Sequence, residues 1–231
     1  MRFKSVIVTV AVGLTLNAGS AWAAEGSEED SSAGLPPAYA KNYLVARSTM
    51  SPDKKFAVIY PTVDFSESKE AKDMLVALKP FSVLAKLPAA DLYFQNRSHG
   101  GISAQWAKDG SVALIILDSK WGPGDVFVVE LSDSKVKRIT NLDEKLRQLV
   151  SPKYKSAKNK PESYNDTYDY IFENEDTAPC SLEGNKVVKF DLTATNDPKG
   201  ISDRPWSVQV KAEWDIAAAK FTSQKITEKR R

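Results

Sequence analysis

Short apolar runs separated by turn-forming residues recur along the chain from Tyr43 onward. The runs are rich in Val, Ile, Leu and aromatic residues, which is typical of β-strands joined by tight turns. A helix over 71–87 is the alternative for one stretch, but Pro80 would interrupt it. We expect strands at 43–47, 56–60, 74–78, 83–87, 102–106, 112–117, 126–131 and 136–139. The chain is therefore predicted to be mainly β and built from antiparallel four-stranded meanders.

The first four of these runs resemble the next four. Segment 51–59 aligns with 107–115 at an offset of 56 residues, and 75–78 aligns with 128–131 at an offset of 53. The difference fits a longer loop in the first copy, and loops tolerate insertions. Each copy has the size of one propeller blade. We predict repeat one at 43–95, repeat two at 100–140 and a candidate third repeat within 164–228.

One segment departs from the strand pattern. Apolar residues recur from Leu142 at i, i+4, i+7 and i+8, Asn141 stands before them as an N-cap, and Pro152 follows them. This spacing predicts one short amphipathic helix near 142–150. Together with the Lys-rich stretch that follows, it forms a helix and basic loop at 141–163.

The turns ahead of the second strands carry a family resemblance. Segment 51–55, which reads Ser-Pro-Asp-Lys-Lys, and segment 108–111, which reads Lys-Asp-Gly-Ser, resemble the Asp-turn repeats of WD-type propellers of the periplasmic TolB kind. The resemblance covers about residues 43–140. It implies a binding scaffold, because such propellers mostly present loops to partner proteins. A closed propeller needs at least four blades, roughly 160 residues, so we expect an incomplete or open propeller.

The first residues predict export. Arg2 and Lys4 precede an apolar run, and Ala21-Trp22-Ala23 fits a cleavage pattern, so we interpret 1–23 as a signal peptide. The protein is then periplasmic or secreted, with no integral membrane segment after signal removal. We expect a flexible leader at 24–42 and a single β-rich domain at 43–231. Losing Arg2 and Lys4 lowers the formal net charge from +2 to 0, which argues against a nucleic-acid partner.

Signatures of catalysis and of metal binding are sparse. His99 is the only His and Cys180 the only Cys, and no Gly-x-Ser-x-Gly motif is present. The acidic stretch 166–176 offers oxygen ligands that suit calcium, but its spacing fits no known calcium loop, and a solvated acidic loop is the other interpretation. We predict no catalytic residue, no metal site and no cofactor.

The connection at 120–125 is the strongest candidate for binding. Trp121, flanked by Gly and Pro, can stand on the loop as a flat platform for a protein or a sugar face, or it can fold back over the sheet. Asp125 in the same loop and His99, in the turn that enters the strand at 102–106, complete the candidate binding residues. We therefore expect an exported, non-enzymatic binding or scaffold module that presents loops to an envelope protein or ligand. The alternatives are a hydrolase that acts on an envelope polymer through carboxylates, and an accessory protein that covers a partner's sheet edge.

Overall fold

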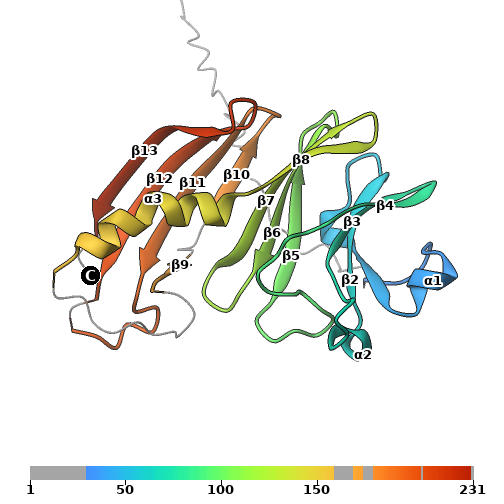
Figure 1. Ribbon diagram of the computed structural model, residues 1–231, viewed down its shortest axis with the longest axis horizontal. Helices are drawn as coiled ribbons and strands as arrows, with labels where there is room; N and C mark the ends of the chain where they lie inside the picture. The colour runs from blue at the N-terminus through green and yellow to red at the C-terminus, as the bar shows by residue number, and fades with distance from the viewer. Residues whose placement is uncertain (1–29, 159–168, 174–178, 204, 230–231) are drawn as a thin grey trace, which may run out of the picture.

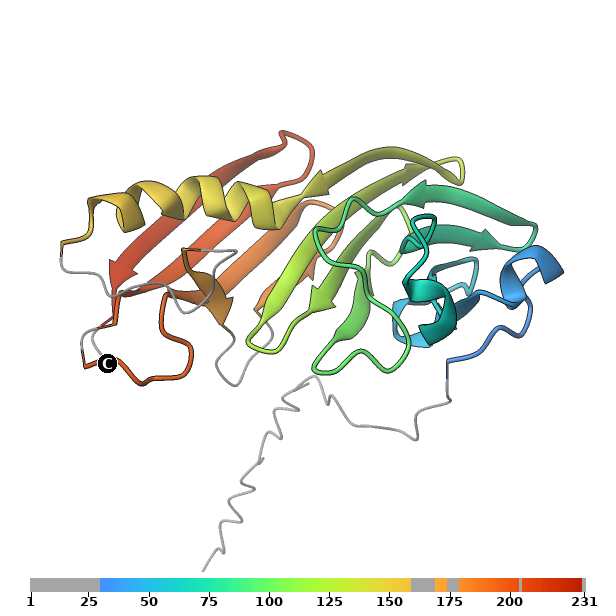
Figure 2. The same ribbon diagram turned by 60° about the horizontal axis from the view of Figure 1, so that its bottom comes forward.

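The computed structural model describes residues 30–158, 169–173, 179–203 and 205–229, so the predicted signal peptide at 1–23 lies outside it. In these residues, three antiparallel sheets stand in a row (Figures 1 and 2). The first sheet has the order β1 (Tyr43–Ala46), β2 (Phe56–Pro61), β3 (Met74–Leu78) and β4 (Phe81–Lys86). The middle sheet has the order β5 (Gly101–Trp106), β6 (Val112–Asp118), β7 (Pro123–Ser132) and β8 (Lys135–Asn141). The last sheet has the order β10 (Cys180–Glu183), β11 (Val187–Thr195), β12 (Ser207–Asp215) and β13 (Lys220–Glu228), with β9 (Ile171–Glu173) also paired to β11.

The protein is thus mainly β and built from antiparallel meanders, as predicted, and the strands expected between residues 43 and 139 are all present close to their expected ends. Equivalent turns precede β2 and β6. The backbone N–H of Ser51 donates to the carbonyl of Phe56 over 2.8 Å, and that of Ala107 donates to the carbonyl of Val112 over 2.9 Å. In both turns an Asp side chain accepts the N–H two residues further on. Phe56 and Val112 therefore begin the second strands of two matching sheets.

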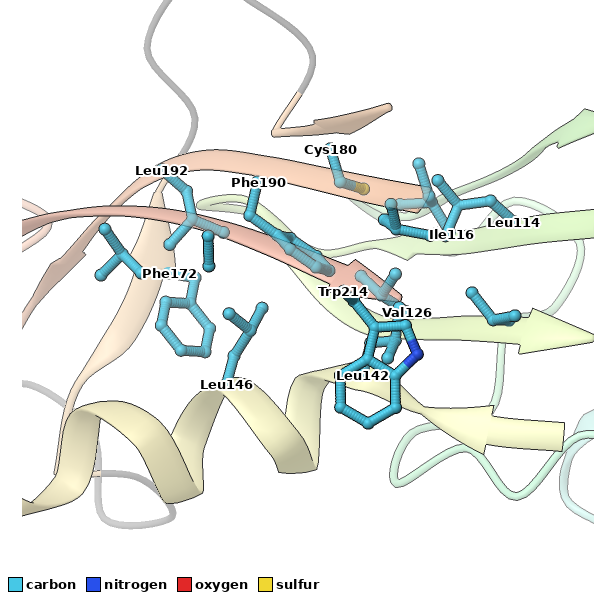
Figure 3. Close-up of a cluster of buried hydrophobic side chains, with 14 of the residues drawn as sticks. Leu114, Ile116, Val126, Leu142, Leu146, Phe172, Cys180, Phe190, Leu192 and Trp214 are labelled. Atoms are coloured by element: carbon cyan, nitrogen blue, oxygen red, sulfur yellow. The ribbon is translucent and has the colours of Figure 1, made fainter. Parts of the chain in front are cut away.

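The middle sheet is buried on both faces. Leu114 and Ile116 of β6 belong to a core shared with the last sheet, whereas the alternate residues Ala113 and Ile115 belong to a core shared with the first sheet. Figure 3 shows the first of these cores, in which side chains from the middle and last sheets meet those of a helix. Because no face of β6 meets water, its apolar run is continuous rather than alternating.

The two outer faces of the row differ in character. Tyr43 and Ile59, on the outer face of the first sheet, are buried with two short helices, α1 (Pro37–Ala40) and α2 (Val63–Ser66), beside them. On the last sheet the exposed face carries charged side chains, among them Lys211, which pairs with Asp191 at 2.8 Å. A covered apolar face and a charged face do not pack on each other, so the row does not close into a ring.

Residues 30–42, which the sequence assigned to a flexible leader, are packed against the first sheet. The Asp30 carboxylate accepts hydrogen bonds from the Arg47 N–H at 2.9 Å and from the Tyr60 hydroxyl at 2.7 Å. Leu35 is buried, and Tyr39 packs its ring on that of Phe81 at 4.8 Å. Isolated apolar residues without periodicity are enough to anchor this segment, so the leader prediction for 24–42 is not met over 30–42.

The predicted helix is longer than expected. The helix α3 spans Leu142–Ser156, and the Asn141 side chain caps its first turn as predicted. Pro152 lies inside the helix rather than beyond it, because the apolar stripe continues to Tyr154, whose ring packs against Trp206 at 5.0 Å. The burial of this ring offsets the backbone hydrogen bond that a proline removes. Neither α3 nor another helix of the described residues is long and apolar enough to cross a bilayer.

Candidate binding site

A polar pocket of about 270 Å³ lies where the β4–β5 connection, the β6–β7 turn, α3 and β9 meet. It brings together His99, Trp121 and Asp125, the three residues that the sequence singled out for binding. We name it the 99/121 pocket. Its lining consists of Asp91, Arg97, Ser98, His99, Ser119, Lys120, Trp121, Pro123, Gly124, Asp125, Arg147, Ile171 and Phe172.

The β4–β5 connection, residues 87–100, lacks strands and helices but is held by buried carboxylates. Asp73, just before β3, accepts a hydrogen bond from the Tyr93 N–H at 2.9 Å. Asp125, in β7, accepts one from the Ala90 N–H, also at 2.9 Å. Because Asp73 belongs to the first sheet and Asp125 to the middle one, the connection is attached to both. Burial raises the pKa of Asp73 to about 7 and also raises the pKa of Asp125.

Asp125 forms hydrogen bonds within the wall of the pocket. Its side chain is buried, with one oxygen bonded to the Ala90 N–H and the other accepting from the Asn141 amide at 3.2 Å. Since Asn141 caps α3, Asp125 links the connection, β7 and the start of the helix. It is therefore a positioning residue for the pocket rather than a group presented to a ligand.

His99 lies at the exposed rim of the pocket. It adopts a left-handed φ of 58°, in a turn that the Gly100 N–H closes by donating to the Arg97 carbonyl at 3.2 Å. The Arg97 guanidinium is half-buried; it donates to the Leu92 carbonyl and pairs with Asp91 at 3.3 Å. These contacts hold the turn that carries the imidazole.

Trp121 occupies a closed turn between β6 and β7. The Gly122 carbonyl accepts hydrogen bonds from the Ser119 N–H at 2.8 Å and from its hydroxyl at 2.9 Å. The indole is half-buried, and the Lys120 ammonium lies 4.8 Å from the centroid of its ring. Gly122 approaches β9 so closely that a Cβ atom there would lie 2.3 Å from the Phe172 carbonyl oxygen. The turn is therefore seated directly on the backbone of β9.

Replacing Gly122 with alanine is expected to push this turn away from β9 and to lower the free energy of unfolding by about 1–3 kcal/mol. The clash is with backbone, which cannot rotate away as a side chain can. Urea unfolding followed by circular dichroism measures the effect. Ser98→Ala, at an exposed position of the same pocket, is the matched control and should change stability by no more than ~0.5 kcal/mol. Equal stabilities of Gly122→Ala and wild type would contradict the close approach.

The far wall of the pocket is formed by Arg147 of α3. Its guanidinium pairs with Asp143 at 2.7 Å and donates to the Tyr170 carbonyl at 3.0 Å. It also lies 5.1 Å from the centroid of the Phe172 ring, whose place between α3 and the last sheet is visible in Figure 3. Burial raises the pKa of Asp143 to about 6 although Arg147 acts to lower it. Sequence reasoning missed Arg147; the Asp143–Arg147 spacing of i, i+4 was the available signal.

The described residues contain neither a cluster of metal ligands nor a reactive thiol. Over the described ranges no group of three or more His, Cys, Asp or Glu side chains could hold a metal ion. Of the acidic stretch 166–176, only 169–173 is described, and Glu173 is buried in β9. Asp166, Glu175 and Asp176 lie outside the described residues. Burial raises the pKa of the Cys180 thiol to about 12, which keeps it protonated and unreactive.

The protein is thus a row of packed antiparallel meanders, and separate loops at their ends form a polar pocket that contains an aromatic side chain. Compared with known proteins, the chain matches no family model, no curated protein and no solved structure.

Proposed function

We propose that this protein is an exported, non-enzymatic binding module that presents the 99/121 pocket to a protein or ligand of the cell envelope. The observation that carries the proposal is that His99 and Trp121, from two separate loops, line one pocket. The Asp91–Arg97 ion pair holds the loop of His99, and close backbone packing of Gly122 on β9 holds the loop of Trp121. Loops positioned by a rigid scaffold are a common way to build a binding site. Export rests on the predicted signal peptide, 1–23.

We also propose that the sheets are blades of an open propeller related to WD-type repeats of the TolB kind. The support is their shared meander order, the equivalent turns before β2 and β6, and the face-to-face packing through common cores. In this arrangement the loops at one end of neighbouring sheets lie close together. The 99/121 pocket then corresponds to a loop cluster on a repeat scaffold, as in binding propellers.

A hydrolase acting on an envelope polymer has less support. Both oxygens of Asp125 accept hydrogen bonds from the protein, so this carboxyl group is not placed to exchange a proton with a substrate. Asp91 is exposed and pairs with Arg97. General acid–base catalysis by two carboxyl groups needs a second group that faces the substrate, and the described lining residues include no third Asp or Glu.

Replacing Trp121 with alanine is expected to weaken capture of the natural partner about tenfold or more, since half-buried aromatic residues commonly dominate binding energy. Stability should change by less than ~1 kcal/mol, because the indole is not part of a buried core. The measurement is affinity capture from a native envelope fraction, together with thermal unfolding of each bait. Ile201→Ala, at a site 79% exposed, is the control for loss of a surface side chain elsewhere. Unchanged capture by folded Trp121→Ala would overturn the proposed site.

A further inference from the structure

We infer that the ligand of the 99/121 pocket is a neutral saccharide chain, one sugar ring of which packs on Trp121. This inference rests on the proposed binding function and names the ligand class. It depends on three properties of the pocket: the pairing of its two guanidinium groups, the polarity of its rim and the rigid seating of its indole.

Both guanidinium groups of the pocket are paired within the protein, and the Lys120 ammonium lies 4.8 Å from the centroid of the Trp121 ring. The Arg97 guanidinium binds Asp91 at 3.3 Å, and the Arg147 guanidinium binds Asp143 at 2.7 Å. An anionic ligand would have to compete with these carboxylates for the guanidinium donors. Asp125, whose carboxyl group is buried, also lines the pocket. Strong binding of an anion at either guanidinium group is therefore disfavoured, and a neutral ligand meets no such opposition.

The rim of the pocket offers both donors and acceptors of hydrogen bonds. Ser98, His99, Ser119 and Lys120 are exposed around the indole. Hydroxyl and imidazole groups can both donate and accept. A ligand with many hydroxyl groups matches such a rim, whereas a purely apolar ligand would leave these groups without partners.

Trp121 supplies the one large apolar surface among these rim residues. Its turn is closed by the Ser119–Gly122 hydrogen bonds and seated on β9, so little freedom remains to be lost on binding. A sugar ring whose hydroxyl groups are all equatorial has flat faces of C–H groups and a polar edge. This shape places C–H groups on the indole and hydroxyl groups at the rim. We therefore expect gluco-configured rings, which have this shape.

The test is titration of the whole mature protein with chitotetraose and cellotetraose, which are neutral. Tetragalacturonate and a Glu-rich peptide serve as anionic comparators. Isothermal calorimetry gives the Kd, and the indole N–H resonances in a proton–nitrogen NMR spectrum report which Trp is contacted. We expect saturable binding of at least one neutral tetrasaccharide, insensitive to salt between 50 and 300 mM, roughly the range over which exposed charges become screened. Trp121→Ala should weaken it at least tenfold, and Trp121→Phe, which keeps a flat ring, by about threefold.

Each of the other possible results overturns one part of the proposal. Failure of wild type to bind either neutral tetrasaccharide, with capture of the envelope partner still lost in Trp121→Ala, overturns the saccharide class and leaves the binding function standing. Salt-dependent binding of only tetragalacturonate or only the peptide overturns the neutrality of the ligand. Saccharide binding that persists in folded Trp121→Ala overturns its location. If Trp121→Ala retains both capture and saccharide binding, the pocket is the site of neither, and both proposals lose it.

Discussion

Replacing Phe127 with alanine is expected to lower the free energy of unfolding by about 4 kcal/mol. Phe127 lies in β7 with no exposed surface, in the core that joins the first and middle sheets. It packs there among residues such as Phe56 and Leu75 of the first sheet. Because the other face of the middle sheet is also buried, the strands cannot shift to fill the space that the ring leaves. The void should therefore persist, which is the condition for a large loss.

Urea unfolding measured by tryptophan fluorescence and circular dichroism tests this expectation. Phe127→Leu keeps most of the volume and should cost less than about 1.5 kcal/mol. Val63→Ala, in α2 with 45% of the residue exposed, should stay within ~0.5 kcal/mol of wild type. A loss below ~1 kcal/mol in Phe127→Ala would be incompatible with two sheets packed through this residue.

Stability is also expected to fall as the pH rises from about 5 to 8, and Asp73→Asn should remove most of that fall. Asp73 is 1% exposed, and its Oδ1 atom has no hydrogen-bond partner among the described residues. Burial raises the pKa of this carboxyl group to about 7, against an unfolded value near ~3.9. The folded state therefore binds the proton more tightly. The resulting stabilisation is complete below the unfolded pKa and is lost as the pH rises through the folded pKa.

The size of this effect follows from the two pKa values. A difference of about three units corresponds to ~4 kcal/mol as an upper figure. Asp125 and Asp143, whose pKa values burial also raises, act in the same direction. The asparagine of the variant carries no charge but leaves an amide N–H to be buried, which costs about 1–2 kcal/mol. At pH 8 we expect Asp73→Asn to be more stable than wild type by about 2 kcal/mol.

Urea unfolding of both proteins at pH 5, 6, 7 and 8 measures the two profiles. Asp91→Asn is the matched control, because Asp91 is exposed and lies within the connection that Asp73 holds. Its profile should run parallel to that of wild type. Parallel profiles for Asp73→Asn and wild type would instead show that another group is responsible for the pH dependence.

The candidate site was predictable from the sequence only where turn-forming residues marked a loop. Trp121 stands between residues that form turns, and it lines the pocket. Asp125 also lines the pocket, where its carboxylate accepts hydrogen bonds from the connection and from Asn141. Arg97 and Arg147 were missed: the i, i+4 spacing indicated the Asp143–Arg147 pair, but nothing in the sequence placed either arginine at the pocket. The sequence indicated more clearly which sheets are covered on one face only. Val188, Phe190 and Leu192 of β11 alternate with polar residues, as in a sheet with one solvent-exposed face.

The sequence by itself determined the strands of the first two sheets, their order within each meander, the Asp turns and the start of α3. These features depend on residues within one turn or strand of one another, so local patterns are sufficient to specify them. The tertiary structure alone decided how the sheets stack, where α3 ends, how 30–42 is anchored and how the 99/121 pocket is assembled. Those features depend on contacts over long separations, such as the hydrogen bonds from the Ala90 N–H to Asp125, 35 residues away, and from the Leu182 N–H to Gln105, 77 residues away. No local pattern encodes such pairs, because each forms only when separate sheets pack together and bury the groups between them.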